Sequence, residues 1–138
     1  MKFQHVPNNA DVGTMTLAEI IDTLGCKVYA GKNQLHVGID YGCASDLMSD
    51  VLAFSQTGAL LLTGLVNVQT IQTAYIAEIK AIVFVRGKTP SASVIALAEE
   101  NNIPLLGTSY SMYEACGILY HKGLVPTMPR VSSKATNG

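Results

Sequence analysis

Polar and cationic residues gather in three short stretches of the sequence, at residues 63–67, 86–89 and 108–111. Each stretch follows an apolar run and precedes a helical pattern, which is the position of a turn between a strand and a helix. Right-handed connections bring such turns to one edge of a parallel sheet, where helix N-termini favour anions. Arg86 and Lys88 add two cations there, so the spacing predicts an anion or phosphate site.

The candidate ligands of this site are small polar residues and the two cations. Arg86 and Lys88 are the better candidates, because neither is needed to cap a helix. A threonine, serine or asparagine just before a helix more often caps that helix than binds a ligand. The residues predicted to bind the ligand are Thr63, Gly64, Asn67, Arg86, Lys88, Thr108 and Ser109.

Two nucleotide-binding motifs are excluded. Gly87, Lys88 and Thr89 match the end of the phosphate-binding loop Gly-x-x-x-x-Gly-Lys-Thr, but Ile82 stands where the first glycine is required. Pro90 also removes a backbone N–H from the turn. The dinucleotide pattern Gly-x-Gly-x-x-Gly does not occur either.

The carboxylates, histidines and cysteines form no catalytic or metal-binding pattern. Asp46 and Asp50 are four residues apart and are expected to share a helix face, for which a solvated surface is the favoured interpretation. Cys116 is expected on the buried face of a helix and is interpreted as packing. The histidines have no nucleophile or metal partner at a recognisable spacing. The sequence therefore predicts a protein without enzymatic activity, metal or cofactor.

Composition indicates one domain that binds neither nucleic acid nor membrane. The chain has 138 residues and a formal net charge of -1, with no concentrated basic surface of the kind that binds nucleic acid. Its longest apolar stretch, near residues 59–66, is too short to span a bilayer, and the first residues lack the apolar segment of a signal peptide. Three widely spaced cysteines are expected to be free buried thiols, which favours the cytoplasm.

The elements that position the polar turns are three apolar runs without alternation, at residues 59–62, 81–85 and 103–106. Such runs are typical of strands buried on both faces of a parallel sheet. Asn67 is predicted to cap the helix after the first run, and residues 89–90 to begin the helix after the second. The inner stripe of the first of these helices is expected to contain Val68, Ile71 and Tyr75.

The remaining helices and strands lie on either side of these runs. Thr16 and Glu19 form a capping box for a helix that ends at Gly25, and Ser111 and Glu114 form another for the last helix. Residues 27–30 and 35–39 are predicted to be two strands joined by a turn, so the sheet is expected to be mixed. A helix from Ser45 is expected to present Leu47, Met48, Val51, Leu52 and Phe54 on one face.

These elements predict an α/β fold, a three-layer sandwich in which helices flank a mostly parallel sheet of four to five strands. Residues 14–124 form the domain. Residues 1–13 are expected to be a flexible segment, and residues 125–138 a disordered tail.

Four segments together resemble a DRTGG domain: ASDLMSDVLAF at 44–54, GALLLTGLVN at 58–67, KAIVFVRGKTP at 80–90 and NIPLLGTSYSMYEACGILY at 102–120. The family is similar to the N-terminal domain of HPr kinase/phosphorylase, and its members stand alone or are attached to phosphate acetyltransferases and CBS-domain pyrophosphatases. Its Thr-Gly-Gly appears here as Thr63, Gly64 and Leu65.

The resemblance implies an α/β domain that is usually regulatory, often dimeric and without chemistry of its own. In pyrophosphatases of this type the domain is associated with regulation by adenine nucleotides. The leading hypothesis is thus a homodimeric regulatory module that binds a phosphorylated small molecule, an adenine nucleotide, at the carboxyl edge of the sheet.

Two alternatives remain open. One is a pure interaction module, in which Tyr113, Tyr120 and Leu124 form a dimer or partner surface without a ligand. The other, ranked last, is a small phosphotransfer or hydrolytic enzyme that uses Asp46 or Asp50.

Overall fold

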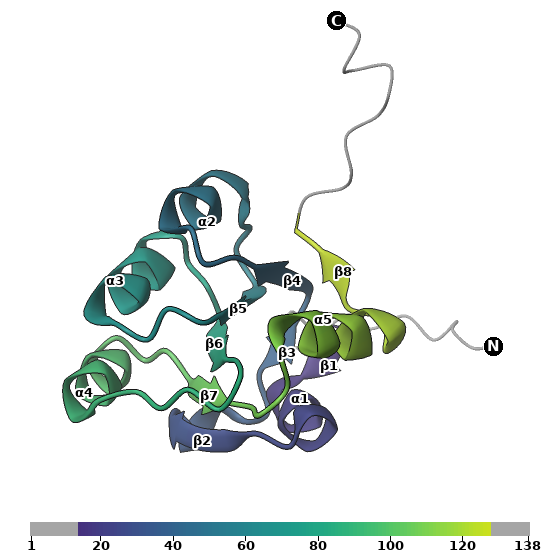
Figure 1. The fold of residues 1–138 in the computed structure, drawn as a ribbon, viewed down its shortest axis with the longest axis horizontal. Coiled ribbons are helices and arrows are strands. Elements are labelled where there is room, and N and C mark those ends of the chain that lie inside the picture. Colours follow the sequence, from purple (N-terminus) through teal and green to yellow (C-terminus); the bar gives the residue numbers. More distant parts are fainter. Residues whose placement is uncertain (1–13, 128–138) are drawn as a thin grey trace, which may run out of the picture.

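A computed structural model of the chain describes residues 14–127, which form helices on both faces of a central sheet (Figure 1). The strands are β1 (Met15–Thr16), β2 (Lys27–Ala30), β3 (Gly38–Ile39), β4 (Tyr41–Ala44), β5 (Ala59–Thr63), β6 (Ala81–Phe84), β7 (Leu105–Gly107) and β8 (Val125–Pro126). The helices are α1 (Leu17–Leu24), α2 (Met48–Phe54), α3 (Val68–Ile76), α4 (Ala92–Glu100) and α5 (Met112–His121), with a 3-10 helix at Lys32–Gln34.

The main sheet has six strands in the order β2-β7-β6-β5-β4-β8. All neighbouring strands are parallel except β2, which is antiparallel to β7. Helices α2, α3 and α4 cover one face, and α1 and α5 cover the other (Figure 1). The predicted three-layer α/β class and the mixed sheet are confirmed, with one strand more than expected.

The continuous apolar runs reflect a sheet that is buried on both faces. In β5, Leu60 and Leu62 contribute to the core beneath α1 and α5, whereas Ala59 and Leu61 contribute to the core beneath α2, α3 and α4. Because successive strand residues point to opposite faces, a strand with two covered faces needs apolar residues at every position. The predicted strands at 59–62 and 81–85 are confirmed for this reason.

Most of the helix boundaries follow local capping rules. Thr16 with Glu19 and Ser111 with Glu114 form both predicted capping boxes, and Gly25 ends α1 with a φ of 62°. Asn67 caps α3 as predicted. The helix after β6 begins later than predicted, because Ser91 rather than Thr89 accepts the capping hydrogen bond, from the N–H of Val94.

The predicted hairpin of residues 27–30 and 35–39 is wrong. After Gly31 the chain forms the 3-10 helix instead of a return strand, and β2 pairs with β7. Only Gly38–Ile39 of the second segment is a strand, and it pairs with β1 in a separate two-stranded sheet. The strand next to β5, which is β4, was not predicted.

Two predicted helix faces are only partly correct. In α2, Met48 and Val51 are buried, but Leu47, Leu52 and Phe54 are exposed. In α3 the inner face is formed by Ile71 and Ala74 with two threonines, Thr70 and Thr73, while Val68 and Tyr75 are exposed. Threonine hydroxyls that bond nearby acceptors allow such a polar inner face, as Thr70 does with the carbonyl of Leu65.

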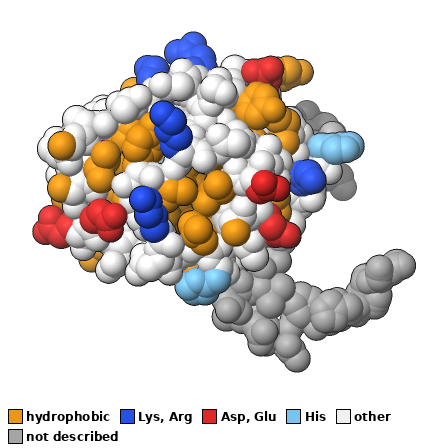
Figure 2. Space-filling model, turned by 90° about the horizontal axis from the view of Figure 1, so that it is seen from below, with side chains coloured by type: hydrophobic (Ala, Val, Ile, Leu, Met, Phe, Trp, Pro, Cys, Tyr) orange, Lys and Arg blue, Asp and Glu red, His pale blue; other side chains and the backbone are white. Residues whose placement is uncertain are grey.

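The predicted disordered tail is wrong at its first residues, because Val125 and Pro126 pair with β4 and Thr127 is buried. The rest of that segment and the predicted flexible residues 1–13 lie outside the described residues. Within residues 14–127, no helix is long and apolar enough to cross a membrane. Figure 2 shows the face on the β2 side, where Lys and Arg side chains are interspersed with hydrophobic side chains.

Candidate functional site

The three polar turns lie together at the carboxyl ends of β5, β6 and β7, and we call residues 63–67, 86–89 and 108–111 the carboxyl rim. Backbone hydrogen bonds join the turns to one another and to the strands. Val85 N donates to the Thr63 carbonyl at 3.1 Å, and Gly87 N donates to the Thr108 carbonyl at 2.8 Å. The parallel pairing of β5, β6 and β7 thus brings the predicted site residues to one edge.

Asp46 also reaches the carboxyl rim. Its Oδ1 accepts hydrogen bonds from Thr63 Oγ1 at 3.0 Å and from Gly64 N at 2.7 Å. Because α2 begins at Met48, Asp46 precedes the helix and does not share a helix face with Asp50, so the predicted shared helix face is wrong, whereas the side chain of Asp46 is exposed as expected. Thr63 and Gly64 are therefore occupied by a carboxylate of the chain itself.

Two further predicted site residues are engaged in the fold. Asn67 Oδ1 accepts from Thr70 N at 2.9 Å and from Thr70 Oγ1 at 3.0 Å. The buried Thr108 donates through Oγ1 to the Leu24 carbonyl at 2.7 Å, which joins the carboxyl rim to the end of α1. These contacts support the helix-cap and packing interpretations of the two residues.

Arg86, Lys88 and Ser109 have exposed side chains at the carboxyl rim. Arg86 and Gly87 both adopt left-handed backbone conformations, with φ of 58° and 69°. Arg86 N donates to the Tyr110 carbonyl at 2.7 Å, so the turn after β6 is fixed to the turn after β7. Arg86 and Lys88, the better candidates of the sequence prediction, thus have exposed side chains on a turn whose backbone is bonded to the neighbouring turn.

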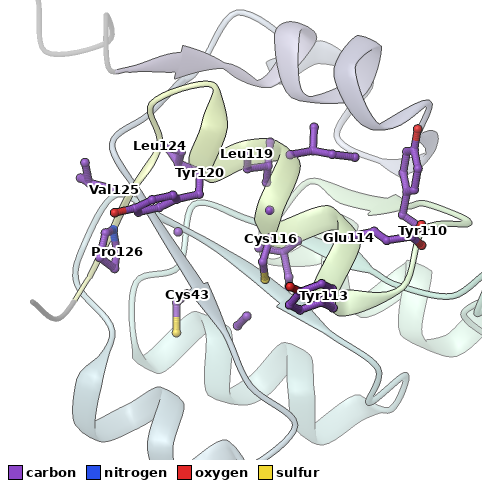
Figure 3. Close-up of a pocket in the computed structure, with 15 residues that line it drawn as sticks. Cys43, Tyr110, Tyr113, Glu114, Cys116, Leu119, Tyr120, Leu124, Val125 and Pro126 are labelled. Atoms are coloured by element: carbon purple, nitrogen blue, oxygen red, sulfur yellow. The ribbon is translucent and has the colours of Figure 1, made fainter. Parts of the chain in front are cut away.

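A cavity of about 740 Å³ lies between α5 and the strands β4 and β8, and we call it the α5 cavity. Tyr110, Tyr113 and Glu114 lie at one end, and Tyr120, Val125 and Pro126 at the other (Figure 3). The sequence prediction missed this cavity. Its one local signal is Gly117 inside α5, where an added Cβ would meet no atom within 4 Å.

Cys43 of β4 and Cys116 of α5 both line the α5 cavity (Figure 3). Burial raises the pKa of the Cys43 thiol, against the effect of a hydrogen bond with Thr127, and the charge of Asp50 raises it further. Burial also raises the pKa of Cys116, with a smaller contribution from Cys43. Both thiols are thus neutral near pH 7 and add apolar surface to the cavity.

The cysteines are free, as predicted, but all three are half-buried rather than buried. Burial raises the pKa of Cys26, which lies outside the α5 cavity, to about 12. Across residues 14–127, no group of three or more His, Cys, Asp or Glu side chains is arranged to hold a metal ion.

Comparison with known proteins identifies the family of the chain and a solved structure that shares its fold. A family model described as the DRTGG domain matches residues 19–121. Among solved structures, the chain is similar to the CBS and DRTGG domains of the regulatory region of a Clostridium perfringens pyrophosphatase, crystallised with its activator diadenosine tetraphosphate. The TM-score is 0.68 at 19% identity, covering 83% of this chain and 49% of that chain.

The likeness to the pyrophosphatase region shows a shared fold, and the chain spans about half of that region's length. No curated protein matches the chain.

Proposed function

The chain belongs to the DRTGG domain family, and from this premise we propose that it is a homodimeric regulatory module that binds an adenine nucleotide at the carboxyl rim without catalysing a reaction. The observation that carries the proposal is the exposed guanidinium of Arg86, which a fixed turn presents where three strand ends converge. The similar pyrophosphatase region was crystallised with a dinucleotide activator that contains adenine and phosphate.

The turn geometry supports Arg86 as the phosphate ligand. A guanidinium forms strong charge-assisted hydrogen bonds with phosphate oxygens, often two at once. The backbone beneath it is held by the bonds from Arg86 N to Tyr110 and from Gly87 N to Thr108. Less conformational freedom is then lost on binding than in a mobile loop, which favours affinity. Lys88, two residues further on, supplies a second cation.

Asp46 determines which part of the carboxyl rim the phosphates use. Its carboxylate accepts the hydrogen bonds that Thr63 and Gly64 would otherwise offer to an anion. Its negative charge also repels a phosphate at that position. The proposal therefore places the phosphates on the side of Arg86, Lys88 and Ser109, away from the turn after β5.

The test is calorimetric titration with ATP, together with a thermal-shift panel of nucleotides. We expect ATP to stabilise the wild-type protein by mass action. Arg86→Ala should weaken binding by about tenfold or more, since a hydrogen bond to a charged group contributes roughly 1.5–3 kcal/mol.

Lys80→Ala is the matched control, because Lys80 is an exposed cation at the opposite end of β6. Binding by this variant should equal that of the wild type. No stabilisation by any nucleotide at millimolar concentration would contradict the proposal, and so would an ATP affinity that Arg86→Ala leaves unchanged.

A second candidate function is an interaction module without a ligand. Tyr113 and Tyr120 of α5 are 89% and 71% exposed beside the apolar α5 cavity, which favours a contact surface. Leu124, expected on the same surface, is instead 3% exposed and belongs to the core. Two results together would favour this candidate. Light scattering would show a dimer that the double variant Tyr113→Ser, Tyr120→Ser dissociates, and the wild type would bind no nucleotide. A monomer at all concentrations would exclude the self-association form.

A further inference from the structure

The α5 cavity has the size and lining of a small-molecule site. Its volume of about 740 Å³ lies within the range of roughly 300–1,000 Å³ that is usual for such sites. The walls are mostly apolar, with tyrosines at both ends and two neutral thiols between them. Glu114 is the one charged residue among the described residues that line it.

The α5 cavity adjoins the carboxyl rim at Tyr110. Tyr110 lines the cavity, and its carbonyl accepts the hydrogen bond from Arg86 N at 2.7 Å. Tyr113 and Glu114 lie at this same end of the cavity (Figure 3). Tyr110 therefore belongs to both regions, and the turn that carries Arg86 lies directly beside this end of the cavity.

The two regions favour opposite ends of one molecule. Apolar walls and aromatic rings favour a flat, uncharged ring, because aromatic groups gain from stacking and from removal of apolar area from water. The carboxylate of Glu114 disfavours phosphate in the cavity, and no cation stands among its lining residues within 14–127. Arg86 and Lys88 favour phosphate outside it.

Gly117 leaves open space where α5 borders the cavity. A glycine inside a helix costs about 1 kcal/mol relative to alanine. Gly117 does not have a positive φ, and no neighbouring atom would obstruct a Cβ there. Neither backbone geometry nor crowding in residues 14–127 requires glycine at this position, where α5 lines the cavity.

We propose that the α5 cavity binds the adenine ring of the nucleotide whose phosphates contact Arg86 and Lys88. This inference rests on the proposed function, and it adds the position of the base and the orientation of the ligand.

The test compares ATP with inorganic triphosphate, which has the phosphates without the ring, by calorimetric titration. Gly117→Leu should place a bulky side chain at the wall of the cavity and weaken ATP binding at least tenfold, while triphosphate binding stays as in the wild type. Gly117→Ala, the matched control with a single added methyl group, should retain most of the ATP affinity. Thermal unfolding verifies that both variants are folded.

Thiol alkylation gives a second readout that needs no substitution. ATP should slow the alkylation of Cys43 and Cys116 several-fold, as followed by mass spectrometry at pH 8. Cys26, outside the cavity, is the internal control and should react at the same rate with and without ATP.

The outcomes separate the inference from the proposed function. If neither ATP nor triphosphate binds the wild type, both fail. A second set of results would overturn the inference alone: triphosphate binds as tightly as ATP, Gly117→Leu does not change ATP binding, and ATP protects neither Cys43 nor Cys116. In that case the base does not enter the cavity, and the proposed phosphate site is retained. Loss of ATP binding in Gly117→Leu together with protection of both cavity cysteines supports the inference.

Discussion

The carboxylate of Asp46 links the segment before α2 to the end of β5 through Thr63 Oγ1 and Gly64 N. Thr63 and Gly64 are buried, so these donors have little access to water. A buried donor without a partner costs free energy, which makes Asp46 a structural acceptor at the carboxyl rim. Asp50, in the first turn of α2, has an exposed side chain.

We expect Asp46→Ala to lower the free energy of unfolding by about 1–3 kcal/mol, because it leaves two buried donors without an acceptor. Asp50→Ala should change it by no more than about 0.5 kcal/mol, as is usual for an exposed surface residue. Urea denaturation of the two variants gives the comparison. Equal effects would show that the hydrogen bonds from Thr63 and Gly64 to Asp46 contribute no net stability.

The thiol of Cys26 predicts a dependence of stability on alkaline pH. Its pKa is raised by burial from 9.0 to about 12, so the folded protein holds this proton more tightly than the unfolded chain. The contribution to stability is complete below about pH 9 and is lost as the pH rises toward 12. As the pH rises between these values, the free energy of unfolding of Cys26→Ala should therefore fall less than that of the wild type. Parallel urea denaturation profiles of the two proteins would contradict the prediction.

Single residues were predictable from the sequence where their partners are near in the chain. Asn67 and Ser111 cap helices through N–H groups three residues ahead, and both caps were predicted. Asp46 bonds partners 17 and 18 residues away, and Thr108 bonds the carbonyl of Leu24. Such contacts depend on which strands become neighbours, so the position of either residue in the sequence does not reveal them.

A helix or strand was predictable where burial of one of its faces, or of both, determines the hydrophobic pattern of its sequence. The buried runs of β5 and β6 were recognised for this reason. β4 has the sequence Tyr-Gly-Cys-Ala, without a continuous apolar run, and β8 has only two residues, one of them proline. Their pairing is set by the neighbouring strand rather than by their own sequence, and the cavity that they border was missed with them.

Gly31 shows why residues 27–39 do not form a hairpin. Its φ is 84°, and a Cβ there would lie 2.6 Å from Cα of Pro104, just before β7. This close approach belongs to the pairing of β2 with β7 rather than with a return strand. Glycine is needed here both for the backbone conformation and for the contact with the neighbouring backbone.

Gly31→Ala should destabilise the protein by roughly 2–5 kcal/mol, the sum of a left-handed backbone and a steric clash. Gly87→Ala is the matched control, since Gly87 has a φ of 69° but an added Cβ would meet no atom within 4 Å. It should lose only about 1–2 kcal/mol, the backbone part. Thermal unfolding of both variants measures the difference. Similar losses would mean that β2 does not approach Pro104 this closely.

Residues 14–127 combine a covered six-stranded sheet with an open region at its β4–β8 edge. Helices cover both faces of the sheet, but between α5 and the β4–β8 edge the cover leaves the α5 cavity (Figure 3). The carboxyl rim adjoins this cavity through the contact of Arg86 with Tyr110. A cationic turn beside an apolar cavity suits a ligand with a charged end and a flat ring, and this arrangement is the basis of the proposed nucleotide-binding role.

The most direct test of this account is a titration of the isotopically labelled protein with ATP, followed by the backbone amide signals in nuclear magnetic resonance spectra. We predict that the largest shifts fall on residues 86–89, on Ser109 and Tyr110, and on α5 from Tyr113 to Gly117, while α1 and α4 stay unchanged. Spectra without shifts at millimolar ATP, or shifts confined to surfaces away from Arg86 and the α5 cavity, would contradict the account.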